Sequence, residues 1–170
     1  MKKTAARREP KATRPRMPGY GMPRGTKGLL PWTWAQERLE RSHNYYVMTV
    51  RPDATPHAMP VWGVWADGRF YFSTGATSRK AKNLAANPSC VICTERSAEA
   101  VIVEGTAVVV SDAERIESVA PFYARKYKPW KLDPAMGLIF EVRPRLAFGL
   151  REKTFKAMTR WLFRDSTRDS

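Results

Sequence analysis

Short runs of apolar residues that alternate with polar ones dominate the middle of the chain, and turn residues separate them. The runs are rich in β-branched and aromatic side chains, which favour strands. They cover residues 44–50, 56–65, 69–74, 89–94 and 100–110. Arg51-Pro52-Asp53-Ala54 and Asp67-Gly68 lie between the first three runs and predict tight turns. The pattern therefore predicts antiparallel strands joined by short hairpins.

Stretches with helix signals interrupt these strands. They cover residues 31–42, 78–86 and 111–126. Thr33 and Gln36 have the spacing of a capping box at the start of the first, and Ser111 and Glu114 repeat it in the third. The second stops before Pro88, because the residue before a proline disfavours helical geometry. Pro121 is a position at which the third helix is expected to split.

The last strand pair is predicted at residues 137–142 and 145–150, with a break at Arg143-Pro144, and residues 154–163 read as a short strand or extended segment. Six or seven antiparallel strands with three helices predict a mainly β protein, a small closed barrel with flanking helices. The chain has no βαβ alternation and no G-x-G-x-x-G sequence. A Rossmann fold is therefore not expected.

Charge divides the chain near residue 28. Residues 1–28 hold nine Lys and Arg against Glu9 alone, a net +8, so the other 142 residues carry +6 of the total of +14. The same segment has four prolines and four glycines and little apolar surface to bury. We expect a disordered basic arm, followed by one domain at residues 29–170. The arm predicts an anionic partner (nucleic acid, an acidic surface or a polyanionic cofactor), and a solvated tail is the equal alternative.

Two compositional features exclude other classes. No apolar run approaches the length of a membrane span, and no secretory signal opens the chain, so we expect a cytoplasmic protein with no membrane partner. Cys90 and Cys93 form a C-x-x-C within a predicted strand, where the two side chains point to opposite faces. No second cysteine or histidine pair completes a zinc site. Both cysteines are expected to be small buried hydrophobes, and no metal site is predicted.

Residues 71–84 carry the most informative chemistry. A predicted strand ends in Ser73-Thr74, and the next helix begins with Ser78-Arg79-Lys80. A helix N-terminus offers free backbone N–H groups and partial positive charge, hydroxyls add neutral donors, and Arg and Lys add charged ones. The segment predicts a phosphate-binding turn. The alternative is an ordinary solvated helix face.

In their order along the chain, four segments together resemble the FMN-binding split barrel of the pyridoxamine 5′-phosphate oxidase-like family. They are residues 46–53, 56–62, 71–88 and 103–107. The third, which contains the phosphate motif, is the most specific. The resemblance extends over about residues 30–163 and implies a homodimer with a cofactor in each of two clefts at the interface.

The resemblance also implies which residues bind the cofactor. The backbone of the second strand is expected along the edge of the flavin ring, and the phosphate motif around the phosphate. A residue of the aromatic and basic C-terminal segment is expected to close the partner's pocket. The implied cofactor-binding residues are Met59, Pro60, Val61, Ser73, Thr74, Ser78, Arg79, Lys80 and Trp161.

The departures from the family pattern narrow the choice of cofactor. The Arg-Leu-His-Asp-Arg-type element that holds the vitamin B6 phosphate is absent, and the only histidines are His43 and His57. Residues 56–65 and Thr159-Arg160-Trp161 resemble instead the branch that uses the deazaflavin coenzyme F-420. The oligoglutamate tail of that coenzyme suits a +8 arm, because exposed ion pairs of ~0.2–1 kcal/mol act together. FMN is the alternative cofactor.

The expected function is hydride transfer from reduced coenzyme F-420 to a small unsaturated or quinone-like acceptor. An FMN-binding reductase or oxidase is the alternative, and a non-catalytic cofactor-binding or nucleic-acid-binding barrel is a third. Tyr46, His57 and Tyr127 are candidate general acids, and the catalytic residue is not identified. Trp62 and Trp65 are three positions apart on a strand and face opposite sides, so at most one lines a ring pocket and core packing is the alternative for each.

Overall fold

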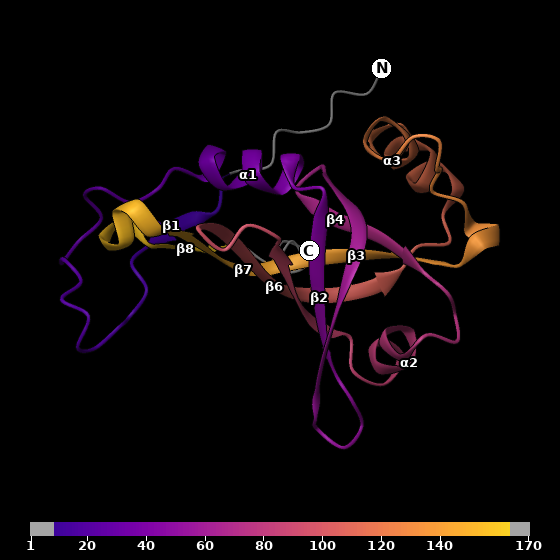
Figure 1. Ribbon diagram of the computed structural model, residues 1–170, viewed down its shortest axis with the longest axis horizontal. Helices are drawn as coiled ribbons and strands as arrows, with labels where there is room; N and C mark the ends of the chain where they lie inside the picture. The colour runs from indigo at the N-terminus through magenta and orange to yellow at the C-terminus, as the bar shows by residue number, and fades with distance from the viewer. Residues whose placement is uncertain (1–8, 164–170) are drawn as a thin grey trace, which may run out of the picture.

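The computed structural model describes residues 9–163, which form a single antiparallel sheet (Figure 1). Its strands are β1 (Lys11–Thr13), β2 (Asn44–Val50), β3 (Pro56–Ala66), β4 (Arg69–Thr74), β5 (Ser89–Thr94), β6 (Glu99–Val109), β7 (Leu138–Arg151) and β8 (Thr159–Leu162). The sheet closes on itself in the order β7-β4-β3-β2-β5-β6, because β6 also pairs with β7. β8 and β1 extend it from the edge of β7. The predicted mainly β split barrel is confirmed.

The hairpin turns follow the sequence. Asp67 and Gly68 both have positive φ angles, 50° and 67°, as a two-residue type I′ turn between β3 and β4 requires. This tight turn fixes the register in which Gly63 lies opposite Phe72 and Ala66 opposite Arg69. The position of Thr74, at the end of β4, therefore depends on a turn that the sequence predicts directly.

One prediction about the strands is wrong. Residues 137–142 and 145–150 do not form a hairpin but belong to one long strand, β7, which pairs with β6 along its length. The register shifts between Glu104 and Gly105 of β6, which leaves Arg145 of β7 as the extra residue. Pro144 cannot donate a backbone hydrogen bond, and a bulge is where a sheet accommodates this. The first half of β7 pairs with β4 and the second with β8.

The helices are α1 (Trp32–Arg41), α2 (Arg79–Ala86) and α3 (Ala113–Lys126), with short 3-10 segments at Pro134–Met136 and Glu152–Ala157. The capping box predicted for α1 does not form, because Pro31 occupies the cap position and makes no side-chain bond. Asp112, not Ser111, caps α3 by accepting from the N–H of Glu114 at 3.1 Å. α3 continues through Pro121 without a split.

Two apolar clusters hold these elements together. The larger fills the barrel and includes Trp32 and Trp34 of α1, the helix that lies along one side of the sheet in Figure 1. The smaller lies between α3 and the outside of the sheet and includes Tyr71 and Tyr123. Val64 and Trp65 are adjacent on β3, yet Val64 belongs to the outer cluster and Trp65 to the inner one. The alternation of β3 therefore serves both cores.

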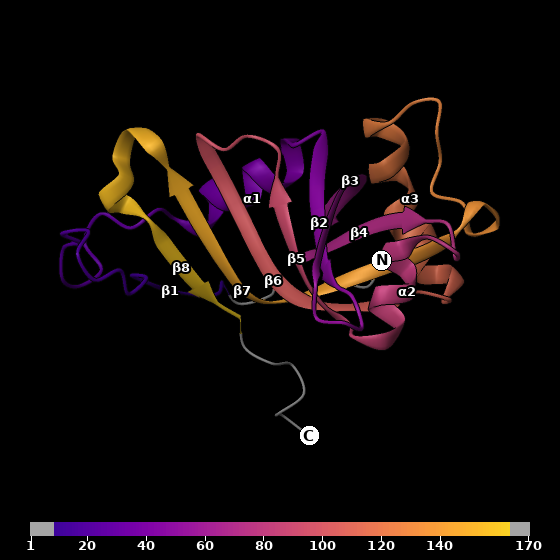
Figure 2. The same cartoon turned by 60° about the horizontal axis from the view of Figure 1, so that its bottom comes forward.

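The described part of the basic arm is ordered, contrary to the prediction of a disordered segment. Lys11–Thr13 form β1, which pairs antiparallel with β8, and Figure 2 shows the two strands side by side. Arg14 also donates to the backbone carbonyls of Gly25 and Lys27. Residues 9–28 are thus tied to the sheet rather than free along their whole length, whereas residues 1–8 lie outside the described part of the chain. A domain boundary at residue 28 stays a prediction.

Candidate cofactor site

A chain of hydrogen bonds joins the end of β4 to the first turn of α2. The ammonium of Lys80 donates to the Thr74 hydroxyl oxygen at 3.0 Å, and the Thr74 hydroxyl donates to that of Ser78 at 3.1 Å. Ser78 in turn caps α2, since its hydroxyl oxygen accepts from the N–H of Ala81 at 3.2 Å. We call Thr74, Ser78 and Lys80 the clamp. Two hydroxyls, an ammonium and a helix N-terminus thus meet at one point, which is the chemistry that holds a phosphate.

The side chains of the clamp are partly withdrawn from water. Thr74, Ser78 and Lys80 are half-buried, and burial lowers the pKa of the Lys80 ammonium below its usual range. The turn between β4 and α2 is closed by the N–H of Ser78, which donates to the carbonyl of Gly75 at 3.0 Å. An anion bound here would replace part of the water around Lys80, so charge compensation favours it.

β3 has an unpaired edge beside the clamp, at residues 59–61, and we call this edge the opening. β3 pairs with β2 over residues 56–62 and with β4 only over residues 63–66, so β4 separates from β3 beyond Gly63. Met59, Pro60 and Val61 therefore have no strand partner on that edge among the described residues. Met59 is 44% exposed, whereas Val61 is buried. An unpaired backbone edge beside a phosphate clamp is a place where a planar ring with polar edges can bind.

A second polar chain stands below this opening. Asn83 of α2 is fully buried, and its amide nitrogen donates to the Thr49 hydroxyl oxygen of β2 at 2.9 Å. Thr49 lies 3.5 Å from Nδ1 of His57. The Thr49 hydroxyl, which already accepts from Asn83, can donate to Nδ1 or accept from it, according to the tautomer of His57. The amide oxygen of Asn83 finds no partner among the described residues.

His57 connects the opening with the clamp electrostatically. Partial desolvation and the positive charges of Arg51, Lys80 and Arg79 lower the pKa of His57 below its ordinary value. Three cations thus surround a neutral imidazole. The position of His57, two residues before Met59 on β3, places this positive field at the edge of the opening.

The sequence reasoning missed the Asn83–Thr49 pair. A usable signal was present, because Thr49 follows the inward-facing Tyr45 and Val47 of β2 at the same spacing. Asn83 likewise falls between Ala81 and Leu84 on the buried side of α2. A polar residue at an inward position of each element indicates that the two meet.

The structure separates two of the predicted residues from this group. Ser73 is on the face of β4 opposite Thr74, on the side of Tyr71, so it does not join the clamp. Trp161 is completely buried in the core of its own subunit, with its ring centroid 5.3 Å from that of Trp32. It also pairs with Ala147 of β7, whereas Thr74 pairs with Leu138 at the opposite end of that strand. Arg79 is exposed on the first turn of α2.

The three candidate general acids, Tyr46, His57 and Tyr127, lie in different parts of the structure. Tyr127 is buried and structural, since its hydroxyl accepts from the N–H of Gly63 at 2.9 Å and donates to the carbonyl of His43 at 2.6 Å. Burial raises the pKa of Tyr127 to about 12. Tyr46 is 44% exposed on the outside of the barrel. Only His57 lies beside the clamp.

The two tryptophans of β3 and the two cysteines behave as their spacing predicts. Trp65 is in the inner core, whereas Trp62 is exposed and stacks on Tyr127 with ring centroids 5.0 Å apart. Cys90 is buried, and burial raises the pKa of its thiol to about 12. Cys93 is half-buried, and burial raises its pKa as well. Neither thiol has the lowered pKa of a redox cysteine.

Comparison with known proteins agrees with this architecture. Residues 34–149 match the pyridoxamine 5′-phosphate oxidase family. Since this covers more than half of the chain, the protein belongs to that family, a flavin-binding split-barrel group that contains oxidoreductases. No curated protein matches the sequence.

Among solved structures, an F420 reductase is 24% identical, with 66% of this chain and 94% of that chain covered and a TM-score of 0.53. A conserved hypothetical protein from Mycobacterium tuberculosis is 21% identical over 80% of this chain and 87% of its own, with a TM-score of 0.61. A putative 5-nitroimidazole antibiotic resistance protein from Bacteroides thetaiotaomicron is 12% identical over 79% and 87%, with a TM-score of 0.61. These likenesses establish the fold. Within residues 9–163, no helix is long and apolar enough to cross a membrane.

Proposed function

We propose that this protein is an oxidoreductase that transfers a hydride from the reduced deazaflavin coenzyme F-420 to a small unsaturated or quinone-like acceptor. The observation that carries the proposal is the clamp, whose three side chains are hydrogen-bonded in series at the N-terminus of α2 beside the unpaired edge of β3. Membership of a flavin-binding family supports the cofactor class, and the similarity to an F420 reductase supports the deazaflavin.

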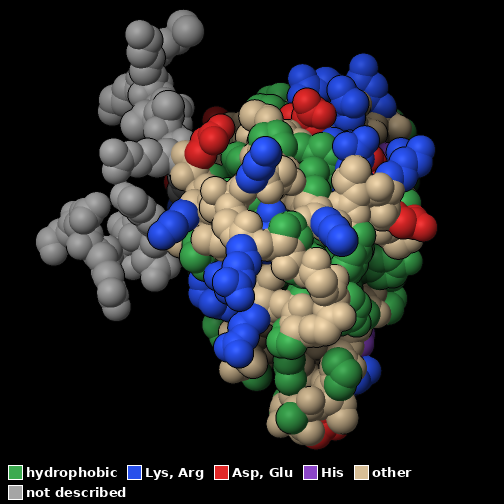
Figure 3. All heavy atoms as spheres, turned by 90° about the vertical axis from the view of Figure 1, so that its left-hand side faces the viewer, with side chains coloured by type: hydrophobic (Ala, Val, Ile, Leu, Met, Phe, Trp, Pro, Cys, Tyr) green, Lys and Arg blue, Asp and Glu red, His purple; other side chains and the backbone are tan. Residues whose placement is uncertain are grey.

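The donor set fits a phosphate. The clamp offers hydroxyl, ammonium and backbone N–H groups, and Arg79 adds a guanidinium at its rim. Lys80 and Arg79 both act on His57, which supports a single positive field over the opening. The net charge of +14 also favours a polyanionic coenzyme. Lys and Arg outnumber Asp and Glu on the end of the molecule that carries β1 and β8 (Figure 3), which is the end of β7 away from the clamp.

The residues of the chain have separate tasks in this proposal. When bound, the coenzyme supplies the hydride chemistry. Lys80, Thr74 and Ser78 bind its phosphate, and the backbone of residues 59–61 binds the edge of the ring. His57, whose lowered pKa favours the neutral imidazole, offers a ring nitrogen for hydrogen bonding without adding a charge. Met59 and Val61 exclude water from one side of the opening.

A homodimer completes the proposal. The outward positions of β2, β3 and β5 carry no charged side chain, and several are exposed apolar groups. Tyr46 is 44%, Val50 36% and Trp62 38% exposed. An uncharged face across three strands, adjoining the opening at Pro60, suits a second copy of the chain. Replacement of Val50 with Glu would place a charge there and shift analytical ultracentrifugation profiles from dimer to monomer.

FMN is the second candidate, because one terminal phosphate satisfies the clamp without any need for the basic arm. The deciding experiment incubates the purified full-length protein with coenzyme F-420 or with FMN, separates free cofactor by gel filtration, and records the absorbance spectrum of the protein fraction. Retention of the deazaflavin spectrum is the expected result. Retention of FMN alone would overturn the choice of coenzyme but keep the clamp, and retention of neither would overturn both.

A further inference from the structure

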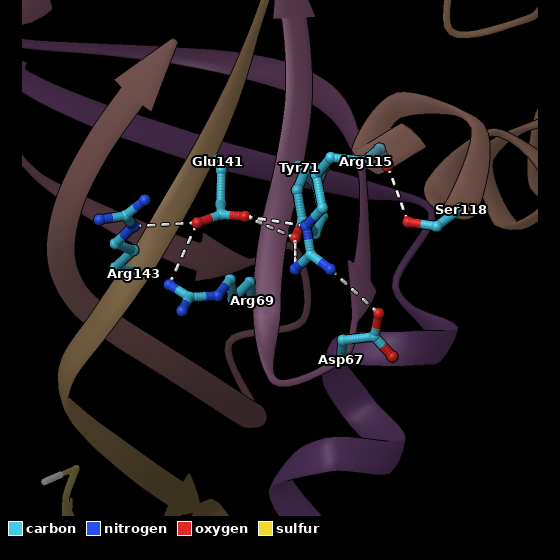
Figure 4. Close-up of polar contacts among 7 residues, drawn as sticks. All are labelled: Asp67, Arg69, Tyr71, Arg115, Ser118, Glu141 and Arg143. Atoms are coloured by element: carbon cyan, nitrogen blue, oxygen red, sulfur yellow. Dashed lines mark hydrogen bonds and ion pairs between the residues drawn. The ribbon is translucent and has the colours of Figure 1, made fainter. Parts of the chain in front are cut away.

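A second charged site lies on the outside of the sheet, between β4, β7 and α3 (Figure 4). Its centre is Glu141, a buried carboxylate of β7 with 7% of its side chain exposed. One carboxylate oxygen forms an ion pair with Arg69 at 3.1 Å and accepts a hydrogen bond from Nε of Arg143 at 3.0 Å. The other accepts from the Tyr71 hydroxyl at 2.8 Å and from Arg115 at 3.2 Å. Glu141 is therefore saturated with donors.

The group carries more positive than negative charge. Arg115 also contacts Tyr71 and lies 3.4 Å from Asp67. Three guanidinium groups thus stand against two carboxylates. Burial alone would raise the pKa of Glu141, but the hydrogen bonds from Tyr71 and Arg143 and the charge of Arg69 hold it below its ordinary value. Glu141 stays ionised, and among Arg69, Arg115, Arg143, Glu141 and Asp67 one unit of positive charge is left over.

Arg143 is where this surplus is available. Its Nε bonds to Glu141, which fixes the plane of the guanidinium, and its side chain is 57% exposed. Its two terminal nitrogens bond to none of the residues 9–163. A guanidinium held in this way presents two parallel N–H groups, the pattern that matches a carboxylate or phosphate.

A hollow of about 440 Å³ lies over these groups. Its charged side is formed by Arg69, Arg115, Arg143 and Glu141, and its other wall by Val108, Val109, Val110 and Ser111. Val109 is 52% exposed. Asp112 also lines the hollow, but its carboxylate accepts from the N–H of Glu114 at the N-terminus of α3, where the helix dipole offsets part of its charge. The hollow thus joins a cationic floor to an apolar wall.

We propose that this hollow binds a small organic anion, with its oxyanion on the terminal nitrogens of Arg143 and its apolar body against Val109. The site is distinct from the clamp. Arg69 begins β4 and Thr74 ends it, so the two sites are at opposite ends of one strand. The headgroup of this anion is an oxyanion, either a carboxylate or a phosphate ester. Its apolar body is a short alkyl chain that contacts Val109.

Calorimetric titration of the full-length protein with hexanoate, at constant low ionic strength, tests this site. We expect one hexanoate per chain, weaker binding of acetate, and a loss of about tenfold or more in affinity in Arg143→Ala, because a charge-assisted hydrogen-bond pair is removed. Hexyl phosphate in a parallel titration identifies the preferred headgroup by its affinity relative to hexanoate.

Arg145→Ala is the matched control. Arg145 is two residues further along β7, 66% exposed and paired with Glu104 at 2.8 Å, outside the hollow. Its loss removes the same charge and should leave hexanoate binding unchanged. Equal weakening in both variants, or none in Arg143→Ala, would overturn the proposal. Lys80→Met should retain hexanoate binding, so failure of the cofactor proposal and failure of this one are distinguishable. Near-UV circular dichroism confirms that each variant is folded.

Discussion

The indole ring of Trp161 lies directly over Gly149, so that a methyl group at Gly149 would come within 2.5 Å of the ring carbon Cη2. Trp34 is nearly as close, at 2.9 Å. The absence of a side chain on β7 thus allows an indole of β8 to enter the core. This contact explains why Trp161 is buried in its own subunit.

Gly149→Ala should therefore destabilise the protein by about 1–3 kcal/mol, the usual cost of overpacking a rigid core. Chemical unfolding monitored by tryptophan fluorescence measures it. Gly75→Ala is the control, because no heavy atom lies within 4 Å of the new methyl group and its φ needs no glycine. Equal stability of the two variants would contradict the packing of Trp161.

Lys80→Met should weaken cofactor binding about tenfold or more, since a charge-assisted hydrogen bond contributes ~1.5–3 kcal/mol. Methionine preserves the apolar stem of the lysine, so the fold is maintained. The measurement is a fluorescence titration with coenzyme F-420 and with FMN. Lys82→Met removes the same charge from an exposed position of α2 and should bind the cofactor normally. An equal loss of cofactor affinity in both variants would mean that the overall positive charge of α2, and not the clamp, binds the cofactor.

Lys126 should make stability depend on pH. Its ammonium donates to the carbonyl of Ser42 at 2.9 Å and to the Tyr45 hydroxyl at 2.8 Å, and burial lowers its pKa to about 8. The folded protein then releases this proton near pH 8, whereas the unfolded chain keeps it to about pH 10.4. Because the unfolded state binds more protons between these values, stability rises with pH.

Relative to Lys126→Met at each pH, the free energy of unfolding of the wild type should increase by about 1–2 kcal/mol between pH 7.5 and pH 9.5, after allowance for partial exposure. Urea unfolding at a series of pH values gives the difference. Tyr45, which contacts the ammonium, has its own pKa raised by burial and stays neutral in this window. A difference that is flat or falls with pH would exclude the lowered pKa.

Removal of residues 1–8 should distinguish the two cofactors. These residues contain Lys2, Lys3, Arg7 and Arg8 and no acidic residue, and their removal leaves β1 intact. We expect affinity for coenzyme F-420 to fall severalfold, because several exposed ion pairs of ~0.2–1 kcal/mol are lost together, and affinity for FMN to stay the same. An equal change for both would remove the charge argument for the deazaflavin.

Local patterns predicted most of the fold. The Asp67-Gly68 turn, the serine cap of α2 and the alternation of Trp62 and Trp65 each depend on near neighbours in the chain, and each is observed. The continuous β7 was not predictable in this way. Pro144 reads as a break, and only the pairing of β7 with β6, a strand far away in sequence, shows that a bulge at Arg145 carries the sheet past it.

In the candidate site, too, contacts between residues close in sequence were predicted and contacts between distant residues were not. Thr74, Ser78 and Lys80 are close in sequence and were predicted as a unit, whereas Trp161 was assigned from the chemistry of a segment without its packing partner, Gly149. Glu141 gave no sign of its role, because its three arginines come from β4, α3 and β7 and meet only in the folded chain. Arg69 and Arg115 are separated from Glu141 by many residues, so no spacing in the sequence indicates their contact with it.

The clamp is made entirely within seven consecutive residues, from Thr74 to Lys80, and it needs only a strand before it and a helix after it. Everything around the opening, by contrast, comes from segments elsewhere in the chain. Substitutions in those segments would change the surroundings of the proposed cofactor ring and leave the phosphate contacts of the clamp unchanged. Under the proposed function, the residues that would hold the coenzyme form one short segment, and those that would select the substrate lie elsewhere, so the second set can change without the first.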